Sequence, residues 1–245
     1  MRKQFIAVFA FALSAAGLVR AENILFGQLI DDPGFTFDSF GNQRTLGTTR
    51  GANFGGTDVS WNGVSLSSTS GANGISWVAV SGTVTNALLY GYTGIYTGSS
   101  PGTAAAADNL TNSGIYGGGT SISISATSGF RYVIDLLFAN ALSETADRIF
   151  DVSVGGVLYA DDLLLRPQSS GDRRPLVYRF EVTAPVSNVI NITFGGGPSG
   201  AGIDPTPYVN AMTVTVPEPS ALSLLVVGLG GVIALRRGRR KGNSI

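Results

Sequence analysis

The sequence predicts an all-β fold, a single sandwich domain that lies between two short apolar ends. Glycine supplies 34 of the 245 residues, about twice its usual share of ~7%. Between the ends the chain breaks repeatedly at Gly, Ser, Asn and Pro. The runs left between these breaks have the length and alternation of strands, and none holds a helical period for long. One domain of ordinary size therefore accounts for the body of the chain.

Runs of strand length make up the predicted sheets, at residues 24–30, 57–61, 64–68, 75–80, 87–92, 121–126, 130–139, 148–154, 176–182, 189–194 and 208–216. In the run 130–139, Asp135 falls on the face opposite Tyr132 and Phe138, beside two apolar neighbours, so both faces are expected to be covered, as in a sandwich. The predicted core includes Tyr132, Leu136, Phe138, Phe150, Val152 and Phe180. Residues 104–112 (AAAADNLTN) are predicted to form an exposed loop with at most one helical turn, because Gly, Ser and Pro flank them.

The N-terminus has the order of a secretory signal. Met1 to Lys3 form a short basic start, and residues 5–19 are an apolar run of 15 residues that is followed by Ala21. Residues 1–21 are therefore predicted to be a signal peptide that is cleaved between Ala21 and Glu22. The sandwich domain is then expected to span residues 22–215, and the alternative for the apolar run is a buried N-terminal helix.

The C-terminus combines three features within residues 216–241. A Pro-Glu-Pro box comes first, followed by an apolar run at 221–235 that is predicted to be a transmembrane helix, and then by a basic cluster. As a helix the run spans about 22 Å, shorter than the ~30 Å hydrocarbon core, so it depends on snorkelling by the flanking arginines. The basic cluster is expected to stay on the cytoplasmic side, which places the body outside. The residues concerned are Val216, Pro217, Glu218 and Pro219 in the box, and Arg236, Arg237, Arg239, Arg240 and Lys241 in the cluster.

This order of parts resembles the PEP-CTERM sorting signal, over about the last 30 residues. The resemblance implies recognition by an exosortase, a membrane peptidase of Gram-negative bacteria that make exopolysaccharide. It also implies removal of the tail, with release or attachment of the body outside the cell. The alternative is an ordinary tail anchor after a Pro-rich linker.

A second resemblance covers residues 120–216. A Gly-x-x-Tyr strand starts at Gly129 and ends in Leu-x-Phe-Ala at Ala139, and an Arg-x-Phe-Asp-Val strand follows from Arg148. These strands and the later runs at 178–214 resemble malectin-like, galactose-binding-type jelly rolls, which implies a jelly-roll-like β-sandwich. Asn140 stands where such domains usually show an acidic residue.

Composition excludes several kinds of chemistry. The chain has no Cys and no His, which removes disulfides, thiol or imidazole nucleophile activation and most zinc sites. Half of the basic residues lie at the two ends, and residues 22–216 hold 8 Arg against 15 acids, a net charge of −7. A body of that charge has no electrostatic reason to bind nucleic acid.

Carboxylates are the catalytic groups that remain, and a glycosidase needs two of them about 5 to 10 Å apart. The densest acidic group is expected at strand ends and turns, where Asp caps backbone donors, so no catalytic residue is predicted. It comprises Asp135, Glu144, Asp147, Asp151, Asp161, Asp162 and Asp172. The pairs Asp161-Asp162 and Asp31-Asp32 suit a structural Ca²⁺ chemically, but no EF-hand spacing supports one, and no cofactor is predicted.

Aromatic residues beside glycine-rich loops are the predicted ligand contacts, because sugar rings stack on such faces. Tyr96 and Tyr116 are the candidates, whereas Trp77 is expected to pack in the core. The predicted function is an exported, non-enzymatic structural or adhesive protein of the cell surface or extracellular matrix. Its expected partners are an exosortase, the cell membrane and extracellular polysaccharide. A carbohydrate-binding module and a carboxylate-based glycan hydrolase or lyase remain as alternatives.

Overall fold

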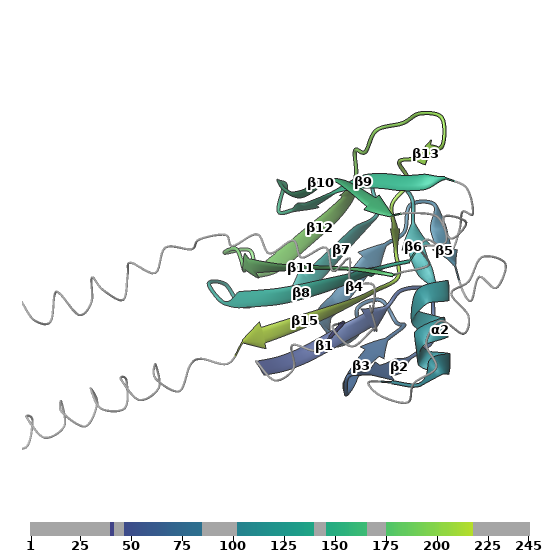
Figure 1. Cartoon of the computed structure of the whole chain (residues 1–245). Coiled ribbons are helices and arrows are strands. Elements are labelled where there is room, and N and C mark those ends of the chain that lie inside the picture. The colour runs from purple at the N-terminus through teal and green to yellow at the C-terminus, as the bar shows by residue number, and fades with distance from the viewer. Residues whose placement is uncertain (1–39, 42–46, 85–101, 140–145, 166–174, 218–245) are drawn as a thin grey trace, which may run out of the picture.

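Alternating apolar residues build two facing sheets and a small third sheet at one end (Figure 1). The structure is a computed structural model that describes residues 40–41, 47–84, 102–139, 146–165 and 175–217. The first sheet has the order β11 (Leu176–Thr183), β8 (Arg131–Phe138), β15 (Ala211–Pro217), β1 (Gly47–Asn53), β3 (Val64–Ser67) and β2 (Val59–Trp61). The second sheet has the order β10 (Val157–Leu165), β9 (Asp147–Val154), β12 (Val189–Gly195), β7 (Ser121–Ser125) and β4 (Ile75–Val78), with β13 (Ile203–Asp204) beside β9. The end sheet consists of β14 (Tyr208–Val209), β6 (Gly114–Tyr116) and β5 (Gly82–Val84).

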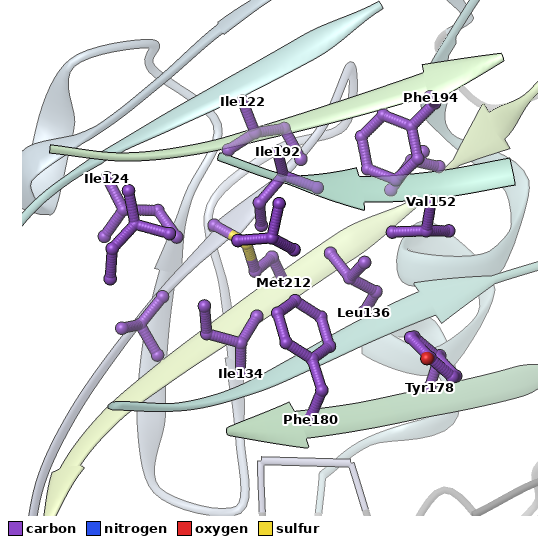
Figure 2. Close-up of a cluster of buried hydrophobic side chains, with 14 of the residues drawn as sticks. Ile122, Ile124, Ile134, Leu136, Val152, Tyr178, Phe180, Ile192, Phe194 and Met212 are labelled. Carbon is purple, nitrogen blue, oxygen red and sulfur yellow. The ribbon is translucent and has the colours of Figure 1, made fainter. Parts of the chain in front are cut away.

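The core lies between the two large sheets. Figure 2 shows Ile134, Leu136, Phe180 and Met212 of the first sheet facing Ile122, Val152, Ile192 and Phe194 of the second. All of these side chains are 2% exposed or less, and the neighbouring rings of Phe138 and Phe150 lie 5.4 Å apart between centroids. The six predicted core residues are all buried, so that prediction is confirmed.

The outer face of the first sheet is covered as well. A second apolar cluster joins β8 and β11 to the helix α2 (Ala104–Asn112) and to the segment before β1. Its members include Phe40, Trp61, Leu66, Ala107, Leu110, Leu137, Val177 and Ala211. Both faces of β8 are therefore buried, which is why seven of its eight residues are buried although they alternate in direction.

The prediction of an exposed loop at 104–112 is wrong, because these residues form α2. The hydroxyl of Thr103 accepts a hydrogen bond from Ala106 N over 3.1 Å and so caps the helix. A helix of this length is only marginally stable by itself, so packing of α2 in the second apolar cluster stabilises it. Asn210 holds its other end, since its Nδ2 donates to Thr111 O and Ser113 O over 2.9 and 2.8 Å.

The predicted strands inside the described residues are all present, and the run 208–216 is divided into β14 and β15 by Asn210. Five strands were not predicted, namely β1, β5, β6, β10 and β13. β10 lacks a simple alternation because its pairing with β9 shifts register twice, and Asp162 within it has a φ of 50°. The predicted strands at 24–30 and 87–92 lie outside the described residues.

The predicted signal peptide at 1–21 and the predicted transmembrane run at 221–235 also lie outside the described residues. Among the residues that are described, no helix has the length and apolar character needed to cross a bilayer. β15 continues to Pro217, which pairs with Gly47 of β1. The last strand of the first sheet thus includes the first two residues of the Pro-Glu-Pro box, two residues beyond the expected boundary at 215.

Candidate functional site

Most of the predicted site residues cannot be placed. Those outside the described residues are Ala21, Glu22, Tyr96, Glu218, Pro219, Arg236, Arg237, Arg239, Arg240 and Lys241. The structure describes Tyr116, Val216 and Pro217, and it places Tyr116 in the end sheet and the other two in β15. Tyr116 and Val216 are both half-buried.

Tyr116 ends β6 and lies beside a glycine of the neighbouring strand. Its Cα pairs with Gly82 on one side and with Tyr208 on the other. A Cβ placed on Gly82 would lie 3.6 Å from both Cε1 and the hydroxyl oxygen of Tyr116. The phenol therefore packs along the backbone of β5, and only part of the ring is open to a ligand.

The turn after Tyr116 requires glycine. Gly117 has a φ of 120°, and a Cβ there would lie 2.4 Å from Ser81 Oγ. Its N–H donates to Pro207 O over 3.3 Å, and Gly119 N donates to Phe194 O over 3.2 Å. The glycine triplet at 117–119 is therefore a turn tied to two other segments, and it fixes the surroundings of Tyr116.

The buried side chain of Arg148 stabilises the segment that precedes β14 of the end sheet. Arg148 Nη1 lies 2.9 Å from Asp204 Oδ2 and donates to Thr206 O over 2.8 Å. Burial lowers the pKa of Arg148, while Asp204 and then Tyr208 act in the opposite direction. Its side chain is only 5% exposed, so this arginine supports the fold rather than offering a cation to a ligand.

Three carboxylates meet at the edge of the second sheet. Asp151 of β9 and Asp161 and Asp162 of β10 each place one oxygen within 4.8 Å of the others. The register shifts in β10 bring the last two together with Asp151, which accepts a hydrogen bond from Asp162 N over 3.0 Å. A Cβ on Gly196 would lie 2.6 Å from Asp151 Oδ2, so the glycine leaves room for this carboxylate.

This cluster includes one of the two Asp pairs predicted as chemically suited to Ca²⁺, while Asp31-Asp32 lies outside the described residues. Ca²⁺ takes six to eight oxygen ligands, and three carboxylates supply only part of such a set. Asp161 and Asp162 are exposed, and exposed acidic groups of this kind are common without an ion. Elsewhere among the described residues, no other three acids lie close enough together to share an ion.

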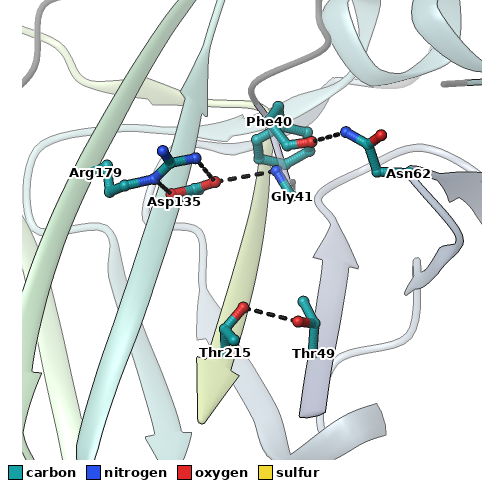
Figure 3. A network of polar contacts seen from close by, with 7 residues as sticks. All are labelled: Phe40, Gly41, Thr49, Asn62, Asp135, Arg179 and Thr215. Carbon is teal, nitrogen blue, oxygen red and sulfur yellow. Dashed lines mark hydrogen bonds and ion pairs between the residues drawn. The ribbon is translucent and has the colours of Figure 1, made fainter. Parts of the chain in front are cut away.

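Asp135 does not lie at a strand end, as was expected for the acidic group, but in the middle of β8. Its two oxygens accept hydrogen bonds from Arg179 Nε and Nη2 over 2.6 and 2.9 Å (Figure 3). Gly41 N also donates to Asp135 Oδ2, over 3.0 Å. This pair is not among the sequence-based predictions, although the alternation in both strands is a signal that places Asp135 and Arg179 on the same face of the sheet. Asp135 is thereby committed to a structural role.

No family model matches the chain, and no curated protein matches its sequence. Among solved structures, the ANX2 ectodomain from Arabidopsis thaliana matches with a TM-score of 0.53 and 11% identity, over 69% of this chain and 50% of that one. The ANX1 ectodomain from the same plant matches with a TM-score of 0.50 and 12% identity, over 69% and 48%. The body is similar in fold to malectin-like domains.

A structure of Bacteroides uniformis beta-glucuronidase 2 also matches, with a TM-score of 0.46 and 21% identity, over 69% of this chain and 18% of that one. The chain spans about half the length of the plant ectodomains that it matches. The likeness to malectin-like domains agrees with the jelly-roll-like sandwich that the sequence predicts, and at these identities it shows the fold alone.

Proposed function

We propose that this protein is exported and sorted to the cell surface or extracellular matrix of a Gram-negative bacterium that makes exopolysaccharide. Its N-terminal signal peptide is removed, and an exosortase acts on its C-terminal tail at the Pro-Glu-Pro box. The malectin-like body is non-enzymatic and has a structural or adhesive role there.

The observation that carries this proposal is the position of the Pro-Glu-Pro box next to the core residues of β15. Met212 and Val214 of β15 are fully buried in the core, and Val216 packs against the core at its edge. Val216 and Pro217, the first two residues of the box, belong to this same strand. The box therefore directly follows the core residues of β15 along the chain, and this position next to the folded body supports its role as a processing site.

The carboxylates of the body support a role without catalysis. Asp135 and Asp204 are each paired with an arginine. In the close group of three, Asp161 and Asp162 are exposed on the edge strand β10, and Asp151 lies on the neighbouring strand β9. Neither arrangement resembles a pair of acids facing each other across a bound sugar. Reducing ends released from the envelope polysaccharide by the purified protein would favour the hydrolase or lyase alternative.

The test of sorting uses Glu218→Ala in a host that makes an exosortase. We expect uncleaved, membrane-inserted precursor to accumulate, because the box is altered while the apolar run remains. Neutralising Arg236 and Arg237 should instead disturb membrane orientation. Glu181→Ala is the matched control, a partly exposed glutamate of the body that should leave processing unchanged. Normal processing and localisation of both the Glu218 and the arginine variants would contradict the proposal.

A carbohydrate-binding role is the second candidate, favoured by the malectin-like fold and by the position of Tyr116 beside a fixed glycine turn. The net charge of −7 favours neutral sugars over uronates. A shallow site gives micromolar to millimolar affinity, about −8 to −4 kcal/mol. Titration of neutral oligosaccharides into the exported protein, with Tyr96→Ala and Tyr116→Ala in parallel, tests this role. Retained binding in the double variant would place the site elsewhere, and no binding by the parent would leave only the structural role.

A further inference from the structure

The end of the sandwich where β15 finishes also carries two loops that cross between the sheets. The loop 126–130 joins β7 to β8, and the loop 184–188 joins β11 to β12. Thr183 pairs with Arg131, which places these two loops side by side. Thr215 pairs with Val133, so two residues further along Pro217 reaches the level of Arg131. Figure 1 shows these loops and the tip of β15 at the same, left-hand end of the molecule.

The two loops are tied to each other by backbone hydrogen bonds. Gly129 N donates to Ala184 O, and Ala184 N donates to Phe130 O, both over 2.9 Å. Ala126 N donates to Asn188 O over 2.8 Å, and Ser128 N donates to the side-chain oxygen of Asn188 over 2.8 Å. These hydrogen bonds join the two loops into one surface with a fixed backbone.

Apolar side chains project from this surface. Phe130 is 48% exposed and Val186 is 91% exposed. The β9–β10 turn lies at the same end, because Gly155 N donates to Asn191 O near the start of β12. It adds Val157 and Leu158, which are 58% and 49% exposed. These four residues form what we call the loop-end patch.

We propose that the loop-end patch rests on the surface of the lipid bilayer while the C-terminal tail is still attached. This inference rests on the membrane-inserted tail of the proposed function. Four peptide steps separate Pro217 from Ala221, where the apolar run begins, and they span at most about 14 Å. Headgroups occupy roughly 5 to 8 Å on each side of the hydrocarbon core. The end of β15 therefore stays within or next to the headgroup layer, and the loops beside it face the same layer.

The chemistry of the patch fits that layer. Aromatic and aliphatic side chains next to polar loop backbone suit the interface between water and hydrocarbon. Arg131 follows Phe130 and is 57% exposed, so its guanidinium is close to the level of lipid phosphates, with Glu181 as its partner within the protein. By contrast, the exposed Val78 and Val80 follow the far end of β4, since Val78 pairs with Ser121 at the start of β7. They serve as the matched control.

The test uses the absence of cysteine from the chain. Phe130→Cys, Val186→Cys and the control Val80→Cys are each introduced into the full-length chain, labelled with a nitroxide and reconstituted into vesicles of phosphatidylethanolamine and phosphatidylglycerol. Flotation of the vesicles measures insertion of the tail separately. Relaxation by oxygen, which partitions into lipid, is then compared with relaxation by a water-soluble nickel chelate. We expect the ratio of oxygen to nickel relaxation to be higher at positions 130 and 186 than at position 80.

Each other outcome overturns the inference. If the protein floats but the ratio is equally low at all three positions, the tail is inserted and the proposed contact between the loop-end patch and the lipid is wrong. An equally high ratio at position 80 would show non-specific adsorption. Spectral broadening at position 130 that disappears on dilution with unlabelled chain would mean that the patch binds a second copy. If the protein does not float with the vesicles, its tail is not inserted, and both this inference and the sorting proposal are wrong.

Discussion

Asp135 and Arg179 lie opposite each other in β8 and β11 and form a two-bonded ion pair on the outer face of the first sheet. The carboxylate is fully buried, whereas the guanidinium is 23% exposed. Asp135 also accepts a hydrogen bond from Gly41 N. The same carboxylate therefore joins β8 and β11 to the segment that precedes β1 (Figure 3).

Removing one partner of this pair should be costly. Asp135→Ala removes the buried carboxylate that accepts from Arg179 Nε, Arg179 Nη2 and Gly41 N, and we expect a loss of about 3 kcal/mol in the free energy of unfolding. Arg131→Ala breaks the more exposed pair with Glu181 and should cost less than about 1 kcal/mol. Urea unfolding measures both variants, and equal small losses would contradict a structural role for Asp135.

The contact between the two sheets is tested by Phe150→Ala. Phe150 is fully buried and packs against Phe138, so the truncation should cost about 3 to 5 kcal/mol, a large part of a typical stability of ~5 to 15 kcal/mol. Val78→Ala, at a position that is 61% exposed, is the control and should have little effect. Thermal unfolding of the Phe150 variant at the temperature of the parent would rule out its burial in the core.

Two tyrosines predict how stability changes in alkali. Tyr178 donates its hydroxyl to Tyr159 O over 2.7 Å, and burial raises the pKa of both side chains above the ordinary value of 10.0. The folded state thus holds these protons more tightly than the unfolded state, so their contribution is complete below pH 10 and is lost as the pH rises further. We expect Tyr178→Phe to be less stable than the parent at pH 8, by about 1 kcal/mol for the lost hydrogen bond. Between pH 8 and pH 11 the free energy of unfolding should fall less in the variant than in the parent. Equal losses in both proteins would show that Tyr178 is not responsible.

The acidic cluster predicts a dependence on salt. Asp161 places a carboxylate oxygen within 4.8 Å of those of Asp151 and Asp162, so Asp161→Asn should relieve like-charge repulsion and raise the melting temperature in about 10 mM salt. The gain should fade near 1 M salt, where the Debye length falls to about 3 Å. The scans are made with a chelator and repeated with calcium. Stabilisation of the parent by calcium, absent from the variant, would mean instead that the cluster holds the ion.

The strands that bury alternating apolar residues could be predicted from the sequence, because burial itself creates the pattern. β9 and β12 are clear examples, and their inward residues belong to the core. β1 was missed because it is short of apolar side chains, and its position next to β15 depends on distant pairing such as Thr49 with Thr215. α2 was missed because contacts from Asn210, about 100 residues away, hold its end.

The candidate sites could be predicted less completely. Tyr116 was selected for its glycine-rich neighbourhood, but its packing on Gly82 depends on a strand, β5, that the sequence did not reveal. The meeting of Asp151 with Asp161 and Asp162 depends on the register shifts in β10, which have no signature in composition. Pairing and register are long-range properties, and local patterns carry little information about them.

The mass of the mature protein outside the cell tests the central claim most directly. The unprocessed chain has a mass of 25.3 kDa. We predict that protein recovered from the surface or matrix of a host with an exosortase starts at or near Glu22 and lacks the apolar run 221–235. Intact-mass and terminal peptide analysis measure both ends at once. A species that still carries Met1 and the complete tail at 25.3 kDa would contradict export and sorting by these signals.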